Sequence, residues 1–174
     1  MTSSAVELPA HGADLRPRAG DIMCIVLLGV VAMLFAGFTA AYFIRRPSPD
    51  WVPIAIPSWS WLGTAALVVS SALLEGARRR QNRSLLGASI LLGFVFLGSQ
   101  VLSWNELSAA GVYLPSTPHG SFYFMLTAVH GVHLLCGLLA LIYTAVRRAE
   151  IRWVAGYWHF MGLIWLYTLL LLAN

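Results

Sequence analysis

The amino-acid sequence predicts an all-α membrane protein, a bundle of five transmembrane helices. Apolar residues make up 59% of the 174 residues and charged residues only 10%, whereas a soluble domain is about half apolar and about a quarter charged. Five apolar stretches are each long enough to cross about 30 Å of hydrocarbon as a helix. The arginines all fall in the polar segments that flank those stretches. We therefore expect one domain, residues 21–174, with spans at about 21–44, 59–77, 85–107, 121–146 and 153–172.

The chain begins with a polar segment, residues 1–20, which is followed by the first span. The segment contains proline and glycine and lacks the residue order of a cleavable signal peptide, so we expect a flexible tail. The first span has no ionisable residue between Asp21 and Arg45 and therefore cannot carry a proton. Small side chains share one of its faces, which predicts close contact with another helix. They are Gly29, Ala32, Ala36 and Thr39.

A loop rich in proline and tryptophan leads to the second span. Proline breaks helices and tryptophan favours the membrane interface, so the loop is predicted to lie at the surface. The second span presents one stripe at helical spacing, made of Thr64, Val68, Ser71, Glu75 and Arg78. Because Glu75 lies near the end of the span and is followed by arginines, we expect it to form an interfacial salt bridge.

The third span carries a stripe of mostly small or polar residues that predicts a buried face. The stripe recurs every three or four residues, as one side of a helix requires, and consists of Ser89, Gly93, Phe96, Gln100 and Ser103. The Gln100 amide needs a hydrogen-bonding partner in hydrocarbon, so we expect it to face a neighbouring helix. Glu106 lies just past the apolar part of the span, beside Trp104, and is expected at the end of the bundle, at the membrane–water interface.

The last two spans place three histidines on polar stripes. The fourth stripe consists of Leu126, His130, His133, Gly137, Ala140 and Thr144, whereas Leu135, Leu138, Leu139 and Ile142 fall away from it. The fifth stripe consists of Ala155, His159, Gly162 and Leu166. A stripe of small or polar residues packs on protein and its opposite face on lipid. We therefore group His130, His133 and His159 with Gln100, Glu75 and Glu106 as structural polar residues of the bundle interior.

The histidines allow two interpretations, because imidazole is also the commonest metal ligand. Histidines on two helices could hold haem or copper, but no carboxylate or thiolate lies near them in sequence to complete a site. Hydrogen bonding between helices is favoured, with no catalytic, cofactor-binding or metal-binding residue in this chain. Cys24 and Cys136 lie in apolar stretches outside any metal-binding motif, so we expect neither a disulfide nor a zinc site.

Composition and motifs bear on the other function classes. The sequence has no GxSxG, glycine-rich phosphate loop or HExxH motif, which argues against catalysis by this chain alone. The net charge of +4 comes from arginines beside apolar stretches, a pattern of membrane topology and not of nucleic-acid binding. A small stand-alone transporter remains an alternative, because Gln100 and the histidines are polar groups within spans. Five spans, however, do not divide into an inverted repeat.

The distribution of arginine predicts the topology. Two arginines, Arg45 and Arg46, flank the first loop, and nine lie on the side of the N-terminus: Arg16, Arg18, Arg78, Arg79, Arg80, Arg83, Arg147, Arg148 and Arg152. Short cytoplasmic segments are enriched in basic residues. We therefore expect a cytoplasmic N-terminus and a C-terminus on the outer, periplasmic face.

Two segments at the end of the chain resemble a known family. The motifs SFYFMLTAVHGVHLLCGLLAL (121–141) and GYWHFMGLIWLYTLLLL (156–172), with HGVH and YWHF about 25 residues apart, are similar to the last two helices of subunit III of the haem-copper oxidases, the cytochrome c oxidase family. The similarity runs from about residue 20 to the end and is best over 97–172. Five spans correspond to the short bacterial form, which lacks two N-terminal helices of the seven-helix form.

The resemblance implies an accessory subunit of a terminal oxidase in the bacterial inner membrane. Such a subunit has no redox centre, lies against catalytic subunit I, which holds haem and copper with subunit II, and accompanies a small subunit IV in some complexes. It binds structural phospholipid and supports proton uptake. Two departures concern the family's mid-membrane glutamate, whose position is occupied by Val31, and an asparagine replaced by Gly63. Related subunits of quinol oxidases and nitric oxide reductases are the alternatives of the same class.

Overall fold

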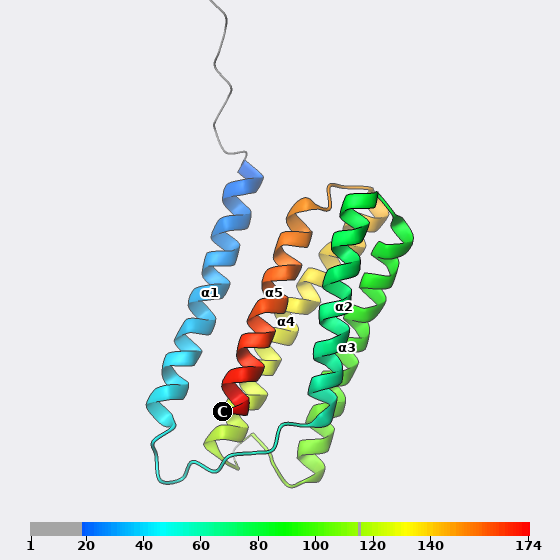
Figure 1. Ribbon diagram of the computed structural model, residues 1–174. Helices are drawn as coiled ribbons and strands as arrows, with labels where there is room; N and C mark the ends of the chain where they lie inside the picture. Colours follow the sequence, from blue (N-terminus) through cyan, green and yellow to red (C-terminus); the bar gives the residue numbers. More distant parts are fainter. Residues whose placement is uncertain (1–18, 115) are drawn as a thin grey trace, which may run out of the picture.

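A computed structural model describes residues 19–114 and 116–174, and within them helices are the only regular secondary structure (Figure 1). The five helices are α1 (Ala19–Arg45), α2 (Ser58–Arg80), α3 (Arg83–Ala109), α4 (Pro118–Arg147) and α5 (Arg152–Ala173). All five are long and apolar enough to cross a membrane. The predicted all-α class and the number of spans are confirmed. Residues 1–18 of the expected tail lie outside the described residues.

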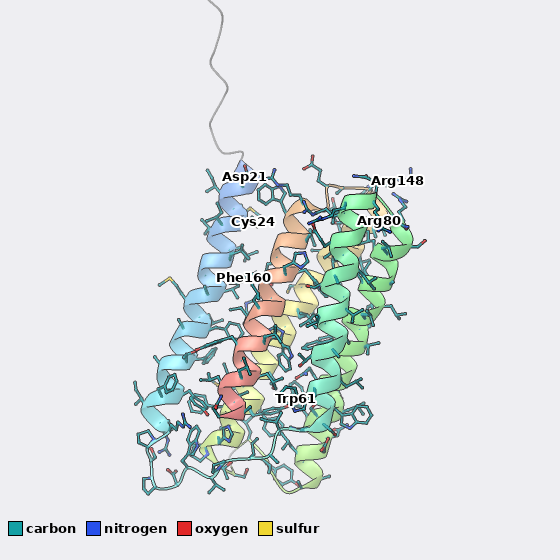
Figure 2. The ribbon with its side chains drawn as sticks, viewed as in Figure 1. Asp21, Cys24, Trp61, Arg80, Arg148 and Phe160 are labelled. Carbon is teal, nitrogen blue, oxygen red and sulfur yellow. The ribbon has the colours of Figure 1, made fainter. Side chains whose placement is uncertain are left out.

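The helices form a group of four with α1 on its flank (Figure 1). Helix α2 packs against α3 and α5, and α4 packs against α3 and α5. In the described part of the chain α1 contacts only α4 and α5. Asp21, Arg80 and Arg148 lie at one end of the bundle and Trp61 at the other (Figure 2). The arginines of the α2–α3 and α4–α5 connections therefore gather at the end where α1 begins.

Two short connections at this end are specified by local hydrogen bonds. The C-cap of α2 is Gln81, whose left-handed backbone lets its N–H donate to the carbonyl of Ala77. The next residue, Asn82, is the N-cap of α3, and its side-chain oxygen accepts from the N–H of Ser84 at 2.9 Å. Arg148 ends α4 in the same left-handed conformation as Gln81. These caps hold α2 against α3 and α4 against α5 as antiparallel pairs.

Close approach of α3 to its neighbours depends on the stripe predicted for this helix, which is buried throughout. A Cβ atom at Gly93 would lie 2.8 Å from Cδ1 of Leu138 and 2.9 Å from Cη2 of Trp158. A Cβ atom at Gly63, on α2, would collide with the hydroxyl of Ser99. A larger side chain at Gly63 would therefore require Ser99 to shift in this packing.

The buried face of α5 differs from its predicted stripe. Trp158, Met161 and Trp165 are fully buried, whereas His159, Gly162 and Leu166 are only half-buried. The expectation that Leu138 lies away from the packed face is also wrong, since its side chain is fully buried. The physical reason is that α5 packs on both α2 and α4, and the broad apolar interface between them takes the bulkiest side chains available.

On α2 the predicted stripe is likewise displaced from the core. Thr64, Ser71 and Glu75 are half-buried and Val68 and Arg78 are exposed. The buried line is the adjacent one, made of Ser60, Gly63, Leu67, Ser70, Leu74 and Ala77, together with Ala66. It faces α3, which follows after a connection too short to allow any other pairing. The predicted polar stripes of α2 and α5 therefore border the packed interior instead of filling it.

Helix α1 packs mainly through bulky residues, and of the predicted small stripe Thr39 contacts α5, where its oxygen accepts from the Tyr167 hydroxyl at 3.0 Å. Val31, Phe35 and Tyr42 are buried, while Gly29 and Ala36 are exposed. A Cβ atom added at Gly29 or Gly37 would meet nothing within 4 Å. Gly29 and Ala36 are therefore turned away from this chain, whereas the side chains of Phe35 and Tyr42 fill the space between α1 and α4.

Candidate functional site

Hydroxyl groups join the helices at several levels of the bundle. The Ser70 hydroxyl on α2 donates to the carbonyl of Ser89 on α3 at 2.9 Å, and Nε1 of Trp158 on α5 donates to the Ser70 oxygen at 3.2 Å. Nearer the other end, the Ser60 hydroxyl lies 2.7 Å from the Tyr123 hydroxyl on α4. These bonds satisfy polar groups where no water is available. The sequence stripes placed Ser89 in this interior but missed Ser60, Ser70 and Trp158.

His130 is fully buried within a box of aromatic rings. Its ring centroid lies 5.1 Å from that of Trp165 and 5.7 Å from that of Phe96. Neither ring nitrogen has a hydrogen-bond partner within the described residues. The predicted interhelical hydrogen bond is therefore wrong for His130, because the side chains that surround the imidazole are aromatic and not polar.

His133 also makes no hydrogen bond to another helix through its ring. Its Nδ1 donates to the carbonyl of Val129 at 2.8 Å, one turn earlier on α4. The side chain is half-buried and lies edge-on to Phe35 of α1, with ring centroids 6.3 Å apart. The interhelical bond at this level comes instead from the Tyr157 hydroxyl, which donates to the backbone carbonyl of His133 at 3.0 Å.

His159 does bond to another helix. Its Nδ1 lies 2.9 Å from the hydroxyl of Ser71 on α2, and its Nε2 lies 3.8 Å from Oε2 of Glu75. Glu75 forms salt bridges with Arg78 and Arg79, at 2.7 and 2.6 Å. The predicted pairing of Glu75 with the neighbouring arginines is thus present, and His159 stands beside it at the end of α2.

The other predicted positions are separate from one another. Gln100 is buried on α3, but neither its amide nitrogen nor its oxygen has a partner among the described residues. Glu106 is exposed near the end of α3, so its inclusion with the bundle-interior residues is wrong. Val31 is 1% exposed and belongs to the apolar core. Among the predicted site residues, the structure therefore places His159 beside Glu75, and His130 and His133 both against Phe35.

His119 is a structural centre that no pattern in the sequence predicts. Its Nδ1 accepts from the N–H of Ile54 at 2.9 Å, and its Nε2 donates to the carbonyl of Leu172 at 3.1 Å. The buried ring also stacks on Trp51. One imidazole thus joins the first loop, the start of α4 and the end of α5. No local motif indicates this role, because His119 lies in a proline-rich segment beside neither partner in sequence.

Metal binding and disulfide formation can be judged from the described residues. Across 19–114 and 116–174, no three His, Cys, Asp or Glu side chains come together in a group that could hold a metal ion. Cys24 and Cys136 are both free. Several of the polar groups described above, such as the hydroxyls of Ser60 and Ser70, form hydrogen bonds between helices.

The unpartnered state of His130 leads to a testable prediction. A buried polar group without a hydrogen bond costs about 1–3 kcal/mol in proteins, so His130→Leu should leave the stability of the chain unchanged or raise it. Thermal unfolding in mild detergent, followed by circular dichroism, measures this. A clear loss of stability would mean that the imidazole has a partner, such as a buried water, that the variant has removed.

Comparison with known proteins identifies relatives that match most of the chain. No family profile matches it. It is 26% identical over 190 residues to a "Probable cytochrome c oxidase subunit 3" of Nocardia farcinica, covering 94% of this chain and 91% of that one. A protein of the same name from Mycobacterium tuberculosis is 28% identical, covering 95% and 92%. The "Cytochrome c oxidase subunit 3" of Struthio camelus is 31% identical, covering 82% of this chain and 64% of that one. The five apolar helices agree with the number of spans predicted from the sequence. Because the similarity extends over nearly the whole chain, we conclude that it is a homologue of the cytochrome c oxidase subunit 3 proteins.

Proposed function

We propose that this chain is a non-catalytic accessory subunit III of a terminal haem-copper oxidase in a bacterial inner membrane. The similarity to proteins named cytochrome c oxidase subunit 3 over nearly the whole chain is the observation that carries the proposal. In this role the chain stabilises the catalytic subunit and supports sustained proton uptake. The haem and copper belong to partner subunits I and II, and a small subunit IV joins them in some complexes.

Several features support an accessory role for residues within the spans. Val31 takes the position of the family's mid-membrane glutamate and is packed among apolar side chains, so α1 offers no proton-carrying group between Asp21 and Arg45. Exposed Gly29 and Ala36 on α1 and the exposed apolar faces of the other helices offer contact surfaces for phospholipid and for partner helices. In this proposal, the polar residues within the spans contribute to helix packing and to assembly with partner subunits. They are His130, His133, His159, Gln100 and Glu75.

The proposed topology has the arginine-rich end of the bundle in the cytoplasm. Single cysteines at Ser3 and Asn174, in a variant lacking Cys24 and Cys136, should be labelled from opposite sides of the membrane by an impermeant maleimide. Position 3 should react only after the cytoplasmic side is exposed. Position 174 should react in cells whose outer membrane has been permeabilised while the inner membrane is intact. Reaction of both from one side would contradict five spans.

The accessory role itself predicts a specific defect when the chain is removed. An oxidase prepared from a strain that lacks this chain should start to reduce oxygen at a rate close to that of the complete enzyme. It should then lose activity during turnover several times faster, because proton uptake and the catalytic subunit are less well supported. Oxygen consumption followed over many turnovers measures both quantities, and adding the gene back is the control. A deletion that leaves the durability of activity unchanged would reject the proposed role.

A further inference from the structure

A groove on the outside of the bundle runs between α2 and α5, which lie side by side in Figure 1. Its volume is about 240 Å³. Buried Leu67 and Trp165 line it together with exposed Val68 and Leu163. Gly162 leaves space on the α5 side, since an added Cβ would lie 3.8 Å from the Ser71 hydroxyl. The groove has the shape into which side chains of another helix can pack.

The groove contains polar groups inside a membrane-spanning region. Ser71 and His159 line it, and Glu75 with its two arginines stands one turn further along α2. The side chain of His159 is 37% exposed. By contrast, the outward faces of α3 and α4 present large apolar side chains such as Leu91, Val132 and Leu139. Lipid therefore suits those faces better than it suits the groove.

One atom in the groove is left without a hydrogen bond. Nδ1 of His159 is bonded to Ser71, and Nε2 lies 3.8 Å from Glu75, which is too far for a hydrogen bond. Both Glu75 oxygens already accept from Arg78 and Arg79. His159 lies seven residues past Arg152, or about 10 Å along the helix axis, and is therefore part of the membrane-spanning helix α5. A lipid acyl chain in the groove would offer Nε2 no hydrogen bond.

We propose, on the basis of the proposed function, that the groove between α2 and α5 is the surface on which this chain docks against a transmembrane helix of its haem-containing partner subunit. That helix places a hydrogen-bonding side chain against Nε2 of His159. Its apolar side chains enter the groove beside Leu67 and Gly162. Near the end of the groove, the guanidinium of Arg79, which is 74% exposed, is available to an acidic group of the partner.

Photocrosslinking in the assembled complex tests the docking surface. The crosslinker benzoylphenylalanine is placed at Leu163, on the groove, and in control variants at Leu139 on α4 and Leu91 on α3. These three leucines are 65%, 58% and 64% exposed, so they are matched in residue type and exposure. The Leu163 variant should crosslink to the haem-containing subunit, and the controls to lipid. Crosslinks to that subunit from Leu139 or Leu91 and only to lipid from Leu163 would overturn the docking proposal.

Two substitutions test the hydrogen bond. His159→Gln keeps a donor and an acceptor, so the partner should co-purify as with the unaltered chain. His159→Leu should weaken the association roughly 3- to 20-fold, the range for one hydrogen bond within a membrane. Equal recovery with both variants would overturn the role of His159. If the unaltered chain itself recovers no haem-containing partner, the proposed function fails; if it recovers the partner but the Leu163 crosslink is to lipid, only the docking proposal fails.

Discussion

Replacing Gly93 with valine should destabilise the bundle more than any other single glycine substitution in α3. Even the Cβ atom would lie 2.8 Å from Leu138 and 2.9 Å from Trp158. The indole of Trp158 is fully buried and its nitrogen is bonded to Ser70, so it cannot move aside alone. Overpacking of this kind costs about 1–3 kcal/mol or more. Thermal unfolding in mild detergent should show a clearly lower midpoint.

Gly98 and Gly87 supply the matched controls for this experiment. Both lie on α3, and an added Cβ at either would meet nothing within 4 Å. Valine at these positions should leave stability unchanged or improve it slightly, because glycine is the poorer helix former by several tenths of a kcal/mol. Equal losses at Gly93 and Gly98 would mean that helix propensity, and not packing between α3, α4 and α5, governs the result.

Replacing His119 with phenylalanine is the second substitution with a large expected effect. Phenylalanine keeps a ring that can stack on Trp51 but removes both hydrogen bonds of the imidazole. The Ile54 N–H and the Leu172 carbonyl then lose their partner, at about 1–3 kcal/mol for each group left buried. The unfolding midpoint should fall. Limited proteolysis should also cut the loop before α2 sooner, since that loop is no longer joined to α4 and α5.

Ser116→Ala is the control at the same end of the bundle. Ser116 exchanges hydrogen bonds with Tyr113 in an exposed turn, where water can replace them. Its loss should change stability by less than about 0.5 kcal/mol. If His119→Phe is as mild as Ser116→Ala, then the loop and the two helix ends hold their positions without the histidine.

The fold could be predicted from the sequence because bilayer thickness sets the length of a span. Five apolar stretches separated by arginine and proline leave one reading of the number and type of elements. The buried face of α3 was also predicted correctly, since Ser89, Gly93 and Gln100 alternate with large apolar residues. In this helix the polarity of the residues and their burial follow the same period.

The faces of α1, α2 and α5 could not be predicted in the same way. Polar and small residues mark a protein-facing surface in a membrane, but they do not say whether that surface is inside this chain or between this chain and another. Trp158 and Trp165, which are fully buried, lie outside the stripe that the sequence predicted for this helix. His159 was predicted to lie in the interior and instead lines an outer groove. The misplaced stripes of α2 and α5 line the groove that the docking proposal assigns to a partner helix.

The role of His119 lay beyond sequence reasoning for a different reason. Its partners, Ile54 and Leu172, are 65 and 53 residues away, and both contribute backbone groups that carry no sequence signature. Buried backbone groups without partners are rare, so such contacts become visible only when the chain has folded.

The composition of the complex purified through this chain tests the central claim most directly. A tagged chain extracted from its own membranes in mild detergent should bring with it a many-spanning, haem-containing subunit in equal amount. After separation of the subunits, the haem spectrum and the copper should remain with the partners. Recovery of the chain as a homo-oligomer that moves a solute in liposomes would contradict the claim. So would stoichiometric haem or metal on the separated chain that is lost in the His133 or His159 variants.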